Sequence, residues 1–214
     1  MTWCLVGSEM CIRDSSGVDP NTILMGWAKN TKDPIWFGQM TQKLKELDYN
    51  ILYLDYDVKK GFGNYEKIDL WWSEFNKENE LSLQLIKFLR SSPTWKKATL
   101  KIYFVNSKKV DSKEILSKVE KMVERKRMVA EFSVINNFED QKNLSEYIRI
   151  KSYDADLILM KLPKLIQGEE KIFINSTNNL FDQIGSSLFL EASNSFVGKL
   201  KSCLLYTSDA ADEV

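Results

Sequence analysis

The chain of 214 residues contains no histidine, and its three cysteines lie near the two ends, at Cys4, Cys11 and Cys203. Without histidine, general-base catalysis by an imidazole is excluded, and so are zinc sites built from Cys and His ligands. Without internal cysteine, the middle of the chain forms no disulfide and offers no thiolate nucleophile. Several enzyme classes are thereby excluded, and we expect the protein not to be an enzyme.

Long apolar runs and a strong charge of either sign are also missing. No apolar stretch approaches the ~20 residues that a membrane span needs. The 30 Lys and Arg residues balance 30 Asp and Glu residues, so the composition does not indicate a nucleic-acid partner. When the terminal segments described next are set aside, a mild basic excess remains, which suits a surface near anionic lipid heads.

Residues 1–15 and 203–214 are expected to be translated sequencing-adapter ends. The codons TGT ATA AGA GAC AG encode the stretch from Cys11, and their reverse complement, read one base in, encodes Cys203 to Tyr206. Two unrelated protein termini have no reason to be reverse complements, and disordered native tails are the alternative. Residues 16–202 are then expected to form a single domain, long enough to bury a core.

Within that domain, short apolar runs alternate with segments of helical periodicity. The runs predict strands over residues 22–27, 50–54, 67–72, 99–105, 128–135, 156–160 and 188–190. The periodic segments predict helices after Asp33, over 80–90, from 111 to 127, within 138–150 and over 168–184. This order is typical of a three-layer α/β sandwich with a mostly parallel sheet.

Several local expectations follow from the pattern. Residues 22–27 indicate a strand buried on both faces. Asp33 and Pro34 suit the start of a helix, and Asp111 with Glu114 fits a capping box. The helix over 80–90 is expected to bury Leu81, Leu85, Phe88 and Leu89. The helix over 168–184 is expected to turn Ile172, Phe173, Leu180 and Ile184 inward and to end at Gly185.

Two loops are candidates for ligand binding. Gly61-Phe62-Gly63 is the nearest approach to a phosphate loop, but no third glycine follows and a strand comes next, which favours an ordinary turn. The loop over 28–33 lies between the first strand and the first helix, where doubly wound sheets often bind ligands. It offers Lys29, Asn30, Thr31 and Lys32, and a solvated loop is the alternative.

Other polar and aromatic groups have simpler interpretations. The carboxylates Asp55, Asp57, Asp69 and Glu74 are not spaced like a calcium loop, and surface solubility is their default role. Gly185-Ser186-Ser187 follows a helix, which is the wrong context for a nucleophile. Trp71-Trp72 suits a strand buried on both faces better than a platform for stacking a base.

Two basic segments, Lys96-Lys97 and 124–127, are expected to be solvated ends of elements, with a membrane-facing or partner-facing role as the alternative. The sequence therefore names no catalytic or metal-ligating residue, leaves any cofactor site open, and predicts no cofactor.

Four segments together resemble a known family. Pro20–Trp27 is similar to a P-N-T-hydrophobic-G motif, Ile68–Trp72 to an I-D-V-W/Y-W strand, and Asp154–Pro163 to a D-A-x-hydrophobic-hydrophobic-x-L-P segment. Trp95 and the strand over 100–105 follow at matching spacing. These motifs belong to the cytosolic C-terminal domain of the electroneutral cation–chloride cotransporters, within the amino acid permease group, and the resemblance covers most of residues 17–196.

The resemblance implies a universal-stress-protein-like α/β fold on the cytosolic face of the membrane, below a transmembrane bundle that performs the transport. It implies that the domain regulates the transporter and pairs with a second copy. The ion-binding residues of the family lie in the bundle, so none is assigned here. The phosphoregulatory segments and long insertions of the animal members have no counterpart in this sequence.

A second hypothesis is a stand-alone nucleotide sensor of the universal-stress type with weak nucleotide binding. The expected sheet and the loop over 28–33 favour it. The glycine-rich phosphate motif that such sensors use is not found in the sequence, which counts against it.

Overall fold

The computed structural model describes residues 21–27, 29, 31–138 and 142–196. In these residues seven strands and five helices alternate. The strands are β1 Thr22–Gly26, β2 Asn50–Asp55, β3 Lys67–Trp72, β4 Thr99–Asn106, β5 Glu131–Asn136, β6 Leu157–Lys161 and β7 Ser187–Glu191. The helices are α2 Pro34–Glu46, α3 Lys77–Ser91, α4 Ser112–Arg125, α5 Leu144–Lys151 and α6 Glu170–Phe181. The expected adapter ends, 1–15 and 203–214, lie outside the described residues.

One sheet contains all seven strands in the order β1-β2-β7-β6-β3-β4-β5. The last five in this order are parallel to one another and form a continuous block. β1 and β2 are parallel to each other but meet this block through an antiparallel β2–β7 pair. The predicted mostly parallel sheet is confirmed, with one antiparallel ladder that the sequence did not predict.

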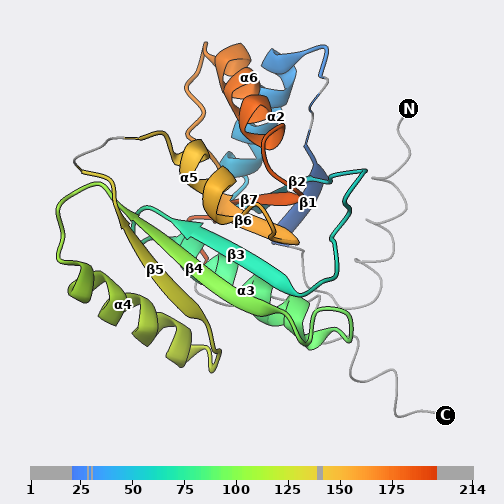
Figure 1. Cartoon of the computed structure of the whole chain (residues 1–214). Coiled ribbons are helices and arrows are strands. Elements are labelled where there is room, and N and C mark those ends of the chain that lie inside the picture. Colours follow the sequence, from blue (N-terminus) through green and yellow to red (C-terminus); the bar gives the residue numbers. More distant parts are fainter. Residues whose placement is uncertain (1–20, 28, 30, 139–141, 197–214) are drawn as a thin grey trace.

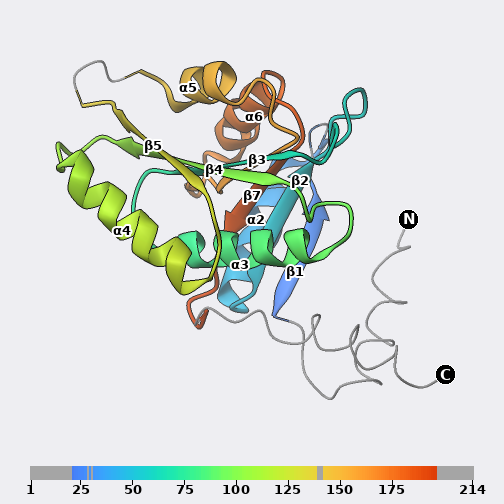
Figure 2. The ribbon, with the colours of Figure 1, turned by 60° about the horizontal axis from the view of Figure 1, so that its bottom comes forward.

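Helices cover both faces of the sheet, which gives the three layers predicted from the sequence. Figure 2 shows the sheet between α5 and α6 on one side and α3 and α4 on the other. Two separate apolar cores result, one against α3 and α4 and one against α2, α5 and α6. No helix in the described residues is long and apolar enough to cross a membrane.

β3 lies in the interior of the sheet and divides its side chains between the two cores (Figure 1). Trp72 belongs to the core under α3, and Trp71 belongs to the core under α5 and α6. Their exposed fractions are 5% and 3%, so the prediction of a strand buried on both faces is confirmed. Because alternate residues of a strand point to opposite faces, two adjacent tryptophans serve both cores at once.

Local signals account for several helix starts. The Asp33 carboxylate accepts a hydrogen bond from the Trp36 amide, and Pro34 begins α2, as predicted. α3 starts earlier than expected, at a reciprocal cap between Asn76 and Asn79. At α4 the Asp111 side chain caps the Lys113 amide, while Glu114, the expected partner in a capping box, bonds Lys118 instead.

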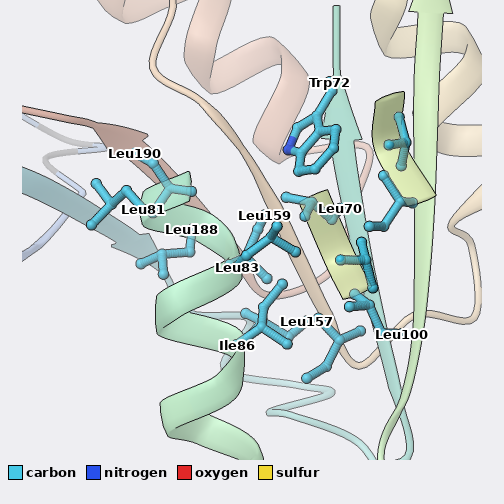
Figure 3. Packing of buried hydrophobic residues seen from close by; sticks show 14 of the residues in the cluster. Leu70, Trp72, Leu81, Leu83, Ile86, Leu100, Leu157, Leu159, Leu188 and Leu190 are labelled. Carbon is cyan, nitrogen blue, oxygen red and sulfur yellow. The ribbon is translucent and has the colours of Figure 1, made fainter. Parts of the chain in front are cut away.

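The buried face of α3 differs in part from the predicted one: Leu81 is buried and Leu85 and Leu89 pack against the core, as expected, but Phe88 does not. Leu81, Leu83 and Ile86 point toward the leucines of β3, β6 and β7 in Figure 3, while Phe88 is 40% exposed. Ser82 lies inside because its hydroxyl accepts from the Trp72 indole and donates to the Asn79 carbonyl. The helix is therefore rotated so that a buried indole N–H has a partner, a requirement that apolar spacing does not reveal.

Three other expectations are wrong. β1 is an edge strand paired only with β2, so Leu24 is 62% exposed rather than buried. α6 buries Phe173, but Ile172 is 65% exposed, because the buried face of the helix is formed by Phe173, Ile174, Thr177 and Phe181. α6 ends at Phe181 with Asp182 as its cap, so Gly185 does not end the helix.

Truncation of Leu83 tests the orientation of α3. Leu83→Ala removes a side chain that is 1% exposed, and we expect a loss of about 2–5 kcal/mol in the free energy of unfolding, because a cavity remains. Phe88→Ala on the same helix is the control and is expected to cost less than about 1 kcal/mol. Urea unfolding measures both, and a larger loss for Phe88→Ala would contradict the orientation.

Candidate functional site

A groove of about 530 Å³ lies where β3 and β6 end. Its lining includes Trp72, Ser73, Glu74, Lys161, Leu162 and Glu191. β3 continues through α3 to β4 on one side, while β6 lies on its other side, so the strand order reverses at this point. Open α/β sheets bind ligands in such a crevice, beyond the carboxyl ends of the strands.

The groove carries an ion-pair cluster of its own. The Lys161 ammonium lies 3.0 Å from a Glu74 carboxylate oxygen and 3.7 Å from Glu78. The hydrogen bond from Lys161 lowers the pKa of Glu74. Burial lowers the pKa of Lys161, but the hydrogen bond to Glu74 and the charge of Glu78 outweigh it, and the net shift is upward. Two cations of the groove are thus paired within the chain, because Lys45 also lies 2.9 Å from Glu191.

The helices α3 to α6 each follow a strand of the parallel block, so all of them begin at this edge of the sheet, and each has a carboxylate in its first turn. α3 has Glu78 and Glu80 there, and α6 begins with Glu169 and Glu170. Hydrogen bonding from the Gly168 amide lowers the pKa of Glu170, so this carboxylate is ionised. Carboxylates at a helix N-terminus use the same partial positive charge that a phosphate would use. The start of α3, where Glu78 pairs with Lys161 of the groove, is therefore poorly suited to a phosphate group.

The Gly61–Gly63 turn surrounds a carboxylate of the protein itself. Asp156, which directly precedes β6, accepts hydrogen bonds from the backbone amides of Asn64, Glu66 and Lys67 at 2.7 to 3.3 Å. Gly63 has φ +51°, and a Cβ there would lie 1.9 Å from an Asp156 oxygen. The glycine is needed for this close approach, and the anion that the loop holds is Asp156, in keeping with the predicted turn.

The other candidate loop, 28–33, lies at the opposite edge of the sheet, where β3 to β7 begin, because β1 runs antiparallel to these strands. Ala28 and Asn30 lie outside the described residues. The Lys29 ammonium is 2.6 Å from an Asp182 carboxylate oxygen. The backbone carbonyl of Lys29 accepts a hydrogen bond from the Asn178 side-chain amide. The loop is thus tied to α6, away from the crevice at the carboxyl ends.

The four carboxylates singled out in the sequence do not converge. Asp55 ends β2, and Asp57 accepts hydrogen bonds from the Lys59 and Lys60 amides in the next loop. Glu74 lies in the groove at the other end of the sheet. In the residues that the structure describes, no group of three or more His, Cys, Asp or Glu side chains is placed to hold a metal ion.

The fourth carboxylate, Asp69, is buried in the middle of β3 with 6% exposure. Burial raises its pKa to about 6, while the Ser152 hydroxyl and Lys101 lower it and the charge of Asp154 raises it further. Lys101 faces Asp69 from β4 but lies 3.6 Å from Glu131 on β5. Asp69 therefore takes part in no ion pair among the described residues, and burial holds its proton more tightly than water would.

The remaining candidates have structural roles. The Trp71 indole N–H donates to Ser152, and its ring stacks on Tyr103 at 4.4 Å between centroids. The Ser186 hydroxyl donates to the Gly61 carbonyl and accepts from the Asp57 amide. These two hydrogen bonds attach the loop that precedes β3 to the start of β7. Ser187 donates to the nearby Gly185 carbonyl. Trp71 also contributes to the lining of the groove, but its indole N–H is already bonded to Ser152.

Sequence reasoning missed Asp156 and Lys161, the two side chains that organise the ends of β6. Asp156 directly precedes β6 and Lys161 is its last residue. Their positions at the two ends of a predicted strand are the signal by which they could have been found. Their partners come from residues about ninety positions earlier in the chain, so the pairing itself depends on the sheet order.

Searches of protein-family profiles and of curated proteins find no match to this chain. Solved structures do match. The cytoplasmic domain of a prokaryotic cation chloride cotransporter has a TM-score of 0.64 and 18% identity, covering 89% of this chain and 70% of that one. A universal stress protein from Archaeoglobus fulgidus has a TM-score of 0.52 and 14% identity, covering 82% and 62%. At this identity the likeness shows a shared fold, the universal-stress-protein-like α/β fold predicted from the sequence.

Substitution of Gly63 tests the contact with Asp156. We expect Gly63→Ala to lower the free energy of unfolding by about 3 kcal/mol or more, since it strains a positive φ and displaces a carboxylate with three amide donors. Gly26→Ala, where a Cβ meets nothing within 4 Å, is the control and is expected to change stability by less than about 0.5 kcal/mol. Additive losses in Gly63→Ala/Asp156→Ala would contradict the contact.

The buried Asp69 predicts a particular dependence of stability on pH. Its carboxyl holds a proton more tightly in the native state, where its pKa is about 6, than at the ordinary value of 3.8. Its contribution to stability is therefore present below pH 4 and is lost as the pH rises to about 6. We expect Asp69→Asn to be more stable than the wild type at pH 7, by on the order of 1–3 kcal/mol, with the difference vanishing near pH 4.

Asp154→Asn is the control for this measurement. The hydrogen bond from Lys67 lowers the pKa of Asp154, so its contribution is present at neutral pH and is lost as the pH falls. The two variants should therefore differ from the wild type in opposite directions at pH 7 in denaturant titrations. A Asp69→Asn variant less stable than the wild type at pH 7 would contradict the buried, unpaired state.

Proposed function

We propose that this chain is the cytosolic regulatory domain of a secondary transporter related to the cation–chloride cotransporters, with no chemistry of its own. The observation that carries the proposal is the fold likeness to the cytoplasmic domain of a prokaryotic cation chloride cotransporter over 89% of this chain. The proposal goes beyond that likeness, which concerns the fold alone.

The positions of the family-like motifs support it. Ile68–Trp72 falls on β3, residues 100–105 fall on β4, and Asp154–Pro163 contains β6. These are three adjacent strands at the centre of the parallel block. Asp156, within the last motif, holds the loop that leads into β3. The shared residues are therefore those that join the central strands, as expected if they specify the domain rather than a catalytic site.

The groove at the strand-order reversal supports a role without a bound phosphate. Lys161 is engaged by Glu74 and Glu78, and α3, which begins beside the groove, carries Glu78 and Glu80 in its first turn. A domain of this kind would act through contacts with other parts of its protein. The proposal accordingly includes attachment to a transmembrane domain, a position on the cytosolic face of the membrane, and pairing with a second copy.

The alternative is a stand-alone nucleotide sensor of the universal-stress type. It is supported by the likeness to the universal stress protein from Archaeoglobus fulgidus. The acidic first turns of α3 and α6 count against it, because the phosphates of a nucleotide would meet the carboxylates there.

Recovery of the complete gene from a longer contig separates the two. A regulatory domain should be preceded by a block of about a dozen apolar spans of ~20 residues each, and titration of the 214-residue chain with ATP should release no heat at millimolar ligand. A complete gene without such spans would contradict the transporter proposal. Saturable ATP binding would favour the sensor instead.

A further inference from the structure

One edge of the sheet collects the loops that precede the parallel strands. We call this the amino edge, and it comprises residues 56–66 before β3, 92–98 before β4, 126–130 before β5 and 152–156 before β6. The first two of these loops extend from the same end of the strands in Figures 1 and 2. α3, α4 and α5 end at this edge, because each leads into the following parallel strand.

The most exposed large apolar side chains of the described residues lie on three of these loops. Val58 is 88% exposed, Val129 is 82% exposed and Tyr153 is 78% exposed. Exposed apolar residues scattered singly need no explanation. Here the three highest values fall on separate loops of one edge, and every other exposed large apolar side chain of the described residues is 65% exposed or less.

Cations are interleaved with these three tips. Lys59 and Lys60 follow Val58, Arg127 precedes Val129 by two residues, and Lys151 precedes Tyr153 by two residues. The exposed pair Lys96-Lys97 lies between them, in the loop before β4. Among the described residues, no ion pair involves Lys59, Lys96, Lys97 or Lys151, so their charges are available to a partner.

Acidic residues are present at the same edge, but several are already engaged. Asp156 is buried and accepts hydrogen bonds from three backbone amides, and Asp57 accepts hydrogen bonds from two. Asp154 pairs with Lys67. Glu66 and Glu124 remain exposed. The outward-facing, unpaired charge of the amino edge is therefore mainly positive.

The spacing of these groups fits a lipid surface better than a protein. A stable protein interface has a contiguous apolar centre with charged residues kept to its rim. The amino edge instead has isolated apolar tips with cations between them. In a bilayer interface, apolar and tyrosyl side chains enter the headgroup layer while neighbouring lysines contact anionic lipid heads.

We propose that the amino edge is a docking surface for an anionic lipid bilayer, with Val58, Val129 and Tyr153 entering the headgroup layer and the surrounding lysines contacting the headgroup anions. In this orientation the amino-terminal ends of the parallel strands β3 to β7 face the membrane. The groove at their carboxyl ends faces away from it. The proposal does not depend on the transporter assignment, because a stand-alone domain would use the same edge.

The test is sedimentation of the 214-residue chain with vesicles of phosphatidylcholine alone or with about one fifth phosphatidylserine. The wild type should bind only the anionic vesicles and lose binding as salt rises. Lys59→Gln/Lys96→Gln/Lys97→Gln should weaken binding by roughly a hundredfold, at about fivefold for each lysine. The matched control is Lys108→Gln/Lys113→Gln/Lys164→Gln, which removes equal charge from exposed lysines at the opposite edge and should leave binding nearly unchanged.

A second variant separates the apolar contribution from the charge. Val58→Ser/Val129→Ser/Tyr153→Ser keeps every lysine and should reduce the binding that persists at high salt. Equal losses in the edge variant and its control would overturn the proposal, as would a wild type that binds no anionic vesicle. A serine variant that keeps full vesicle binding but dissociates a wild-type dimer in ultracentrifugation would also overturn it, by identifying a protein interface.

Discussion

The burial of β3 on both faces is the constraint on which the rest of the structure depends. A strand that presents Trp72 to one side and Trp71 to the other requires an apolar layer on each side of the sheet. α3 and α4 supply one layer, and α2, α5 and α6 supply the other. Each indole also needs a hydrogen-bond acceptor, and Ser82 and Ser152 provide one on each face. The two helical layers are thus positioned by polar contacts as well as by apolar packing.

Much of this architecture follows from the sequence, because strands and helices that alternate with short connections admit few arrangements. The helix start at Asp33 and the two-sided burial of Trp71 and Trp72 are local properties, and sequence reasoning predicted them. The exposure of Phe88 and of Leu24 depends on which neighbours are present, namely a serine partner for an indole and the free side of an edge strand. Contacts between residues far apart in the sequence do not appear in the hydrophobic periodicity. The antiparallel pairing of β2 with β7 was not predicted for the same reason.

The groove at the ends of β3 and β6 illustrates why fold and function separate in this architecture. The sheet order creates the crevice in any protein of this topology. What the crevice does depends on its side chains, and here Lys161 is held by Glu74 and Glu78. The chain itself thus neutralises a cation of this crevice, which is consistent with a domain that works through its surfaces.

The single antiparallel ladder between β2 and β7 has a consequence for how the chain assembles. The unit β1–α2–β2 joins the rest of the sheet only through β7, the last strand in sequence. During synthesis, more than a hundred residues emerge after β2 and before β7, its partner in this ladder. Until β7 is complete, one edge of β2 therefore has no partner strand. Contacts of such long sequence separation form slowly, and an open strand edge favours pairing with another chain. The interval before β7 appears is therefore the stage of biogenesis at which this protein is most exposed to misassembly.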